Sequence, residues 1–499
     1  MLFTTVVFAL LYLPVTLAGF FVAARWSRKA AAGWLLIASL FFYGFWMPVF
    51  TWMLLSSIAV NFLIGLQLMR ARVAVGGREA VPLRARLWLA GGVAVNLGLL
   101  GYFKYANFLV DNLNAALNAQ WSIGTVVLPI GISFYCFTQI AYLVDTCQGK
   151  VREANIVHYG LFVTYFPHLI AGPVLHHAQM MPQFADGSIY TPRAARLVAG
   201  LLIFCIGLFK KIILADGISP YADAVFKAAE TGQSPSLAEA WLGAAAYTLQ
   251  LYFDFSGYSD MAIGLSWMFN IRLPINFDSP YRATSISDFW RRWHISLSTF
   301  LRDYLYIALG GNRKGELRRN ANLMVTMLLG GLWHGASWSF VIWGGLHGLY
   351  LLVNHAFRDA VGSRWRALLD ASPSANIGGW VLTMLAVVVG WVFFRAETLS
   401  GALRMLDAMV GRGTGSSEMG LLWNAGLQAS TGAAWAVVLS VVAVIGPNSN
   451  GIGVRLLTLA ERPGPARAAF GAAGVLFMLF LLTVNTARDS VSAFIYFNF

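Results

Sequence analysis

The chain of 499 residues is 58% hydrophobic and 11% charged, and its mean hydropathy is +0.64. Because a soluble globular protein carries roughly 25% charged residues, this composition excludes an ordinary soluble domain. The formal net charge of +13 does not require nucleic acid as a partner, and we expect none, because the cytoplasmic loops of membrane proteins carry excess lysine and arginine.

Several stretches are long and apolar enough to cross the ~30 Å hydrocarbon core as helices. They are residues 2–23, 33–50, 51–69, 378–394 and 467–485. No basic residue precedes the first stretch and no small-residue cleavage site ends it, so we expect a retained helix and not a signal peptide. The apolar runs do not alternate with polar residues, which excludes a membrane β-barrel. The sequence predicts an all-α polytopic membrane protein of about 10–12 spans.

Basic residues cluster after the first and the third apolar stretches. They are Arg25, Arg28 and Lys29, then Arg70, Arg72, Arg78, Arg84 and Arg86. The positive-inside rule places both clusters in the cytoplasm. Both clusters lie in the cytoplasm if the N-terminus is outside, because the first and the third stretches then both cross from outside to inside.

The chain reads as a single membrane domain in three parts. These are N-terminal scaffolding spans (1–103), an interrupted middle (104–355) and C-terminal spans (356–499). In the middle part Gly, Pro and polar residues interrupt short apolar segments. Broken backbone at membrane depth is tolerated only where protein buries it or where it lines a watery cavity. We therefore expect re-entrant segments and a cavity within residues 125–350.

The histidines all fall in this middle part. They are His158, His168, His176, His177, His294, His334, His347 and His355. An intramembrane ionisable residue is a candidate functional residue, although a buried histidine is often only hydrogen-bonded to a neighbour. The spacing of the first four histidines fits no common zinc site, and Cys136, Cys147 and Cys205 have no metal-like spacing, so no metal is expected.

Residues 288–311 have the period of a strongly amphipathic helix. The apolar face carries Phe289, Trp290, Trp293, Leu297, Phe300, Leu301 and Tyr304, and the opposite side carries Arg291, Arg292, Arg302 and Asp303. We expect this helix to lie along the membrane interface or to dip into the cavity. His294 lies on the flank of the apolar face and can point inward.

GGLWHGASW (330–338) places His334 among glycines and tryptophans, inside a segment of spanning length, 320–345. Glycines allow a backbone or a ligand to approach closely, and Trp333 and Trp338 supply rigid walls. The sequence therefore predicts a narrow, apolar pocket with one titratable group.

A neutral imidazole in such a pocket can take a proton from a hydroxyl, and burial keeps it neutral. No serine or cysteine stands directly beside His334, so direct acyl transfer from a thioester to an alcohol fits best. His294 would hold the thioester carbonyl or position the acceptor.

Four stretches together resemble the membrane-bound O-acyltransferases, and in particular the bacterial alginate O-acetylation branch. They are LPIGISFYCFTQIAYLVD (128–145), YFPHLIAGPV (165–174), 249–315 with its RRWHISLS, and 323–348 with its LWHGA. The resemblance implies a ring of membrane helices, with re-entrant and amphipathic helices, around a central tunnel. It also implies that His334 is the catalytic histidine and that His294 occupies the family's second polar position.

The resemblance further implies a cytoplasmic thioester donor, most simply acetyl-CoA, and no bound cofactor. Candidate phosphate contacts are Arg291 and Arg292, with Arg313, Lys314, Arg318 and Arg319 near them. Trp290, Trp333, Trp338 and Asp254 are candidate substrate contacts, although Asp254 and Asp260 suit helix caps equally well. Expected partners are the donor, membrane lipids and a periplasmic or membrane-anchored acetyltransferase, and the expected location is the bacterial inner membrane.

Several acceptors remain open. Alginate or a similar exopolysaccharide ranks first, and cellulose, peptidoglycan or a D-alanylation-type reaction follow. Two other classes compete, a secondary transporter or polymer exporter and a non-catalytic scaffold. The absence of paired halves and the scarcity of intramembrane acids disfavour transport, and the intact histidine pair disfavours a scaffold.

Overall fold

The computed structural model describes residues 1–73, 81–151, 153–170, 172–413, 415, 420–488 and 493–495, so Arg78 of the second basic cluster lies outside the described residues. The chain divides into two compact units. Unit 1 comprises Met1–Leu208, Tyr258–Ile275 and Gly453–Phe497, and unit 2 comprises Phe209–Gly257 and Asn276–Ile452. Each unit is therefore assembled from chain segments that are distant in sequence.

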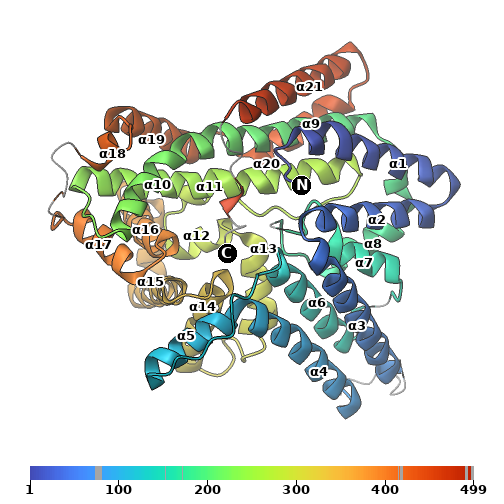
Figure 1. Cartoon of the computed structure of the whole chain (residues 1–499), viewed down its shortest axis with the longest axis horizontal. Coiled ribbons are helices and arrows are strands. Elements are labelled where there is room, and N and C mark those ends of the chain that lie inside the picture. The colour runs from blue at the N-terminus through green and yellow to red at the C-terminus, as the bar shows by residue number, and fades with distance from the viewer. Residues whose placement is uncertain are drawn as a thin grey trace. The chain divides into compact units, whose positions relative to one another are not determined.

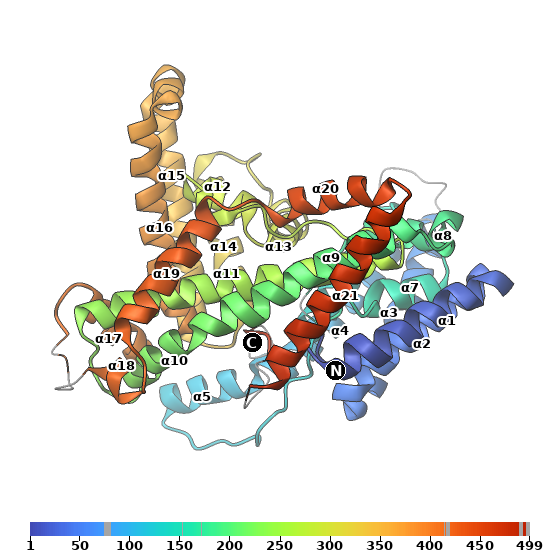
Figure 2. The same cartoon turned by 90° about the horizontal axis from the view of Figure 1, so that it is seen from above.

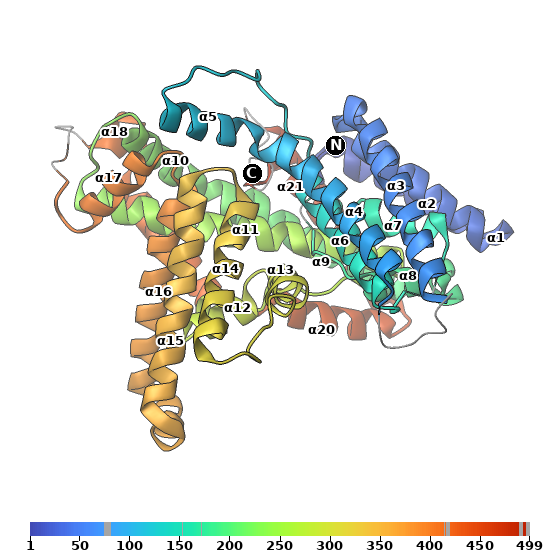
Figure 3. The same cartoon turned by 90° about the horizontal axis from the view of Figure 1, so that it is seen from below.

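Unit 1 is a bundle in which α1 packs beside α2, and α3, α4 and α6 pack against one another (Figures 1 and 3). Its helices are α1 (Leu13–Trp26, preceded by π-helical Phe8–Tyr12), α2 (Arg28–Trp46), α3 (Pro48–Val73), α4 (Leu83–Leu100, followed by π-helical Gly101–Tyr105), α5 (Ala106–Leu117), α6 (Ile132–Cys147), α7 (Ile156–Thr164), α8 (His177–Ala185), a 3-10 turn (Gly187–Tyr190), α9 (Ala194–Phe209) and α21 (Pro465–Thr486). The three cysteines are buried free thiols.

Unit 2 contains the long helix pair α15 and α16, which run side by side (Figure 2). Its elements are a π-helical turn (Lys210–Ala215), α10 (Asp216–Glu230), a 3-10 turn (Pro280–Arg282), α12 (Ile286–Arg292), α13 (Ile295–Phe300), a second π-helical turn (Leu301–Tyr306), α14 (Glu316–His334), α15 (Trp338–Ala371, kinked at Gly362), α16 (Pro373–Arg395), α17 (Leu399–Met409), α18 (Leu421–Asn424) and α19 (Ala429–Val444). Helices α11 (Leu237–Met268) and α20 (Ser449–Glu461) belong in part to each unit, and the last residue of α9, Phe209, belongs to unit 2.

Within the described residues the structure is helical without strands, which confirms an all-α polytopic membrane protein. Eight helices there are long and apolar enough to cross a membrane, or nine if α19 and α20, bent by 62°, form one broken span. They are Phe8–Trp26, Arg28–Trp46, Pro48–Arg72, Leu83–Leu117, Ala194–Glu230, Trp338–Gly362, Pro373–Arg395 and Pro465–Thr486. This number is below the 10–12 predicted, because the middle of the chain folds into shorter pieces.

Two predicted continuous helices are broken in the structure. Residues 288–311 form α12, α13 and a π-helical turn, with His294 at the first break. Residues 320–345 do not form one span, because α14 ends at His334 and α15 begins at Trp338. Hydrophobic periodicity continues through both breaks, so it did not reveal them. Each break leaves a histidine at a helix terminus.

A close backbone contact holds α14 against α15. A Cβ atom added at Gly331 would lie 2.2 Å from the carbonyl oxygen of Phe340, and one added at Gly344 would lie 2.4 Å from that of Met327. Only glycine permits this approach, which is how small residues bring membrane helices together. The contact fixes the end of α14, and therefore His334, against the first turns of α15.

We predict that Gly344→Ala separates α14 from α15 and destabilises the protein by about 1–3 kcal/mol, as overpacking typically does. Gly345→Ala is the matched control, since its added Cβ would make an ordinary 3.5 Å contact with Leu328. The measurement is the midpoint of thermal unfolding of both variants in detergent. Equal midpoints for the two variants would contradict the close contact.

Candidate active site

His334 is the last residue of α14 and is buried among aromatic rings of unit 2. Its ring centroid lies 5.0 Å from that of Trp333 and 5.1 Å from those of Trp343 and Phe394. The chain then turns through Gly335 into α15. The imidazole therefore sits at a helix end, in an apolar box contributed by α14, α15 and α16.

His294 lies between α12 and α13 in a left-handed backbone conformation, with φ of 43°. Asn276 supports this break. Its Oδ1 accepts a hydrogen bond from the backbone N–H of Ser296 (3.2 Å) and from the Ser296 hydroxyl (2.8 Å), and its backbone oxygen accepts from Ile295 N–H (3.0 Å). Left-handed backbone costs free energy outside glycine, and these bonds offset that cost.

The same Asn276 Oδ1 lies 3.1 Å from Nδ1 of His294. Because Oδ1 already accepts the backbone N–H of Ser296, it is an oxygen that can only accept, so Nδ1 of His294 carries the proton. Nε2 of His294 then bears a lone pair. Burial lowers the pKa of His294 to about 3, from an ordinary 6.5, so the ring is neutral near pH 7.

The two histidines, forty residues apart in the sequence, come together in the fold. Their ring centroids are 6.4 Å apart, and Trp333 lies 6.3 Å from His294. Phe255 closes the other side of His294, at 4.8 Å. The site thus holds a pair of buried imidazoles in aromatic walls.

His347 is a third buried histidine near this site. Its ring lies 4.9 Å from Trp343 and 5.3 Å from Trp290. A hydrogen bond to a neighbour is the common structural role of a buried histidine, but neither ring nitrogen of His347 has such a partner among the described residues. The spacing of Trp343 and His347, one helical turn apart, is the signal that could have placed both on one face of α15.

The tryptophans predicted as pocket walls (Trp333 and Trp338) or as a substrate contact (Trp290) differ in their positions. Trp333 is buried beside His334, and Trp290 packs against Trp343 at 5.8 Å. Trp338, in contrast, is 56% exposed at the start of α15 and does not wall the buried box. Trp343 takes that place. It lies five residues further along α15, and so on a different face of the helix from Trp338.

Asp254, in the middle of α11, forms an ion pair with a buried lysine. Its Oδ1 lies 2.5 Å from Nζ of Lys211, and the same ammonium binds Asp216 at 2.8 Å. The alternative expectation of a helix cap is wrong for Asp254 and for Asp260, because both lie within α11 and not at its ends. Asp254 therefore balances the charge of Lys211, a residue that sequence analysis did not single out.

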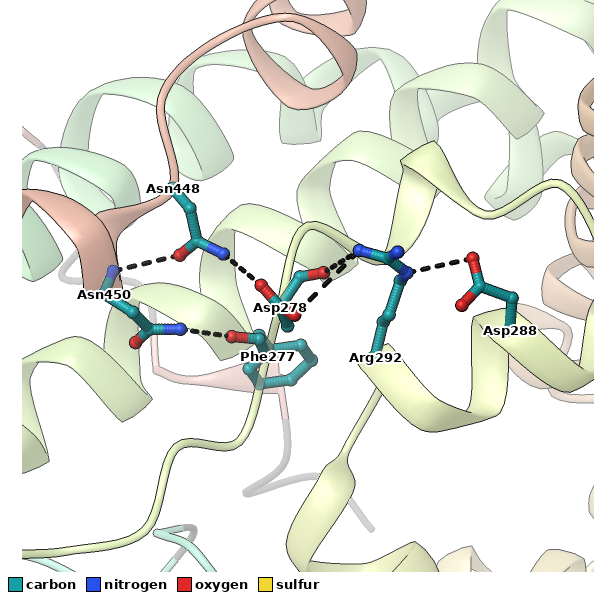
Figure 4. Close-up of polar contacts among 6 residues, drawn as sticks. All are labelled: Phe277, Asp278, Asp288, Arg292, Asn448 and Asn450. Atoms are coloured by element: carbon teal, nitrogen blue, oxygen red, sulfur yellow. Dashed lines mark hydrogen bonds and ion pairs between the residues drawn. The ribbon is translucent and has the colours of Figure 1, made fainter. Parts of the chain in front are cut away.

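Arg292 is also engaged within the protein (Figure 4). It lies 2.9 Å from Asp288 and 3.9 Å from a carboxylate oxygen of Asp278, and it donates to the Asp278 backbone oxygen at 3.3 Å. Asn448 donates to the other Asp278 oxygen at 2.5 Å. Asp278, in the loop before α12, thus links Arg292 to Asn448 in the turn before α20.

Arg291, one residue earlier, faces a pocket of about 470 Å³. The polar lining comes from α12, α14 and α15. It consists of Ser287, Arg291, Arg319, His355, Arg358 and Asp359. Of the two arginines predicted to contact phosphate, Arg291 therefore lines a pocket, whereas Arg292 is held in a structural ion pair.

The histidines of unit 1 make local contacts. His158 pairs with Glu153, His177 Nδ1 lies 2.9 Å from Asp145, and His168 Nε2 lies 3.1 Å from the backbone oxygen of Phe162. These contacts agree with a structural interpretation of the three residues. Nowhere in the described part do three His, Cys, Asp or Glu side chains gather as metal ligands would.

The chain is similar to known membrane-bound acyltransferases. Residues 147–394 match the model of the MBOAT, or membrane-bound O-acyltransferase, family. The chain is 42% identical over 438 residues to a peptidoglycan O-acetyltransferase of Helicobacter pylori, covering 82% of this chain and 80% of that protein. It is 44% identical over 438 residues to a probable alginate O-acetylase AlgI of Pseudomonas aeruginosa, covering 86% and 79%.

A more distant relative is a teichoic acid D-alanyltransferase of Bacillus subtilis, 26% identical over 272 residues, covering 53% of this chain and 66% of that protein. The region matched by the family model contains both RRWHISLS and LWHGA, and hence both buried histidines of the pair. With this identity over most of its length, the chain belongs to the membrane-bound O-acyltransferase family and is an O-acyltransferase.

Proposed function

We propose that this enzyme moves an acetyl group from a cytoplasmic acyl thioester, most simply acetyl-CoA, to a hydroxyl outside the cytoplasmic membrane, for O-acetylation of an exopolysaccharide such as alginate. The observation that carries the proposal is the buried pair His294 and His334, 6.4 Å apart in aromatic walls. The relative named as a probable alginate O-acetylase supports the polymer.

His334 acts as the general base in this proposal. It takes the proton of the acceptor hydroxyl as the oxygen attacks the thioester carbonyl. The new C–O bond forms, the C–S bond breaks, and the departing thiolate receives the proton from the imidazolium. The aromatic walls exclude water, which otherwise would compete for the acyl group.

His294 acts as a positioning residue. Its Nδ1 proton is held by Asn276, so the neutral ring offers only the Nε2 lone pair, which accepts a hydrogen bond. An acceptor cannot stabilise an oxyanion. Of the two expected roles, we therefore favour orienting a substrate through one of its own N–H or O–H groups over holding the thioester carbonyl.

The orientation of the chain is part of the proposal. Basic residues near the ends of α1, α3 and α4 favour a cytoplasmic location for those ends, by the positive-inside rule, and hence an N-terminus outside. The bacterial relatives favour the inner membrane. A periplasmic or membrane-anchored partner acetyltransferase would pass the group to the polymer.

Peptidoglycan is the second candidate acceptor. The relative from Helicobacter pylori bears the name of a peptidoglycan O-acetyltransferase and matches this chain over a similar length. Analysis of ester-linked acetate in isolated exopolysaccharide and in isolated peptidoglycan, with and without the protein, distinguishes the two polymers.

We predict that His334→Ala abolishes acyl transfer, with a loss of at least about 10²-fold, because general-base catalysis contributes that much. The measurement is transfer of the radiolabelled acetyl group of acetyl-CoA to an acceptor hydroxyl by purified protein in detergent, together with acetylation of the polymer in cells. His158→Gln, in unit 1, is the matched histidine control and should stay active. Full activity of folded His334→Ala would refute the assignment.

We predict that His294→Ala lowers turnover by an order of magnitude or more, because misplacing a substrate by about 1 Å costs up to about 10²-fold. The pKa of His294 is near 3, so the ring is protonated only below that pH and does not titrate from about pH 5 to 8. His294→Asn should therefore lower the rate without moving any inflection of the pH–rate profile in that range. A shifted inflection would show that His294 itself titrates there.

A further inference from the structure

One short loop segment, from Asn276 to Asp278, holds the backbone on both sides of His294. Two residues before His294, the carbonyl oxygen of Arg292 accepts a hydrogen bond from the N–H of Asp278 at 2.9 Å. One residue after it, the N–H of Ile295 donates to the carbonyl oxygen of Asn276 at 3.0 Å. Because the side chain of Asn276 also binds the imidazole, at 3.1 Å, a displacement of this 276–278 segment displaces the ring of His294.

The turn between α19 and α20 holds the same segment from another part of the sequence (Figure 4). The side-chain amide of Asn448 donates to a carboxylate oxygen of Asp278 at 2.5 Å, and that of Asn450 donates to the carbonyl oxygen of Phe277 at 2.8 Å. Oδ1 of Asn448 accepts the backbone N–H of Asn450 at 2.9 Å, which fixes the two asparagines relative to each other. Two side chains far beyond His294 in the sequence thus hold the segment that holds His294.

Phe277, in the middle of the segment, also contributes to the aromatic wall around His294. Its ring centroid lies 4.8 Å from that of Phe255 and 5.1 Å from that of Trp293. Phe255 in turn lies 4.8 Å from His294. The bond from Asn450 to the backbone of Phe277 therefore restrains both the hydrogen-bonded side and the packed side of the imidazole.

Resting on the proposed function, we propose that Asn448 and Asn450 are positioning residues for acyl transfer, and that they act on the substrate through the 276–278 segment and His294. His294 offers the substrate a single lone pair, on Nε2, so the direction of that lone pair depends on the orientation of the ring. The two asparagines fix this orientation from a distance. Neither asparagine needs to touch the reacting atoms.

The test is a double-mutant cycle, which separates an effect that passes through His294 from a general effect on the fold. The asparagine pair is changed in Asn448→Ala/Asn450→Ala, alone and together with His294→Ala. The measurement is the initial rate at which membranes of polymer-producing cells transfer radiolabelled acetyl groups from acetyl-CoA to the polymer. Each rate is divided by the amount of monodisperse enzyme extracted from the same membranes, so that a loss of folded protein does not count as a loss of turnover.

We expect the asparagine pair to lower the rate about 10-fold when His294 is present, because misplacing a substrate by about 1 Å costs up to about 10²-fold. When His294 is already alanine, we expect the same pair of changes to lower the rate by less than about twofold. The residual rate of His294→Ala is the reference for this second comparison.

Asn107→Ala/Asn114→Ala is the matched control, because these two asparagines of unit 1 also tie a loop to a helix. Asn107 donates to the backbone oxygen of Gly124 at 2.9 Å, and Asn114 donates to that of Trp121 at 2.8 Å. We expect this control pair to change the rate by the same factor with and without His294.

An equal loss from the Asn448 and Asn450 changes in both backgrounds would overturn the inference while leaving the roles of His294 and His334 intact, and so would a normal rate in the presence of His294. If the pair of changes prevents folding, Asn450→Ala alone passes through the same cycle, with an expected loss of about threefold only when His294 is present. Wild-type turnover of His294→Ala, or the absence of acetyl transfer by the wild type, would instead overturn the proposed function and this inference with it.

Discussion

The close contact between α14 and α15 is the constraint on which the site in unit 2 depends. Gly331 and Gly344 bring the backbones within a distance that any side chain would prevent. That approach sets His334 against Trp343, and it also places Arg319 of α14 beside Arg358 of α15 at the basic pocket. A single backbone contact thus helps to position both His334 and the arginines of α14 and α15 that line the pocket.

Interrupted helices supply the chemistry. His334 ends α14, and His294 occupies the left-handed residue between α12 and α13. The cost of that conformation is offset by Asn276, which binds Ser296 and His294 with one oxygen. The same contact selects the tautomer of His294, so the support for the broken backbone also determines whether the imidazole donates or accepts.

Neighbouring charges in the sequence serve different purposes in the fold. Arg292 is held by Asp288 and Asp278, whereas Arg291 faces the pocket. Asp254 is held by Lys211, and this pairing allows both charges to be buried. The role of a charged residue in this protein therefore depends on which partner the fold places beside it.

The sequence by itself determined the membrane helices, because hydropathy is a local property, and it singled out His334 and His294, because an ionisable group among apolar residues is costly. The order of its motifs determined the family. Only the tertiary structure decided where helices break, that Trp343 and not Trp338 packs beside His334, and that Arg291 and Arg358 line one separate pocket. These features depend on contacts between residues far apart in the chain, and hydrophobic periodicity carries no record of such contacts.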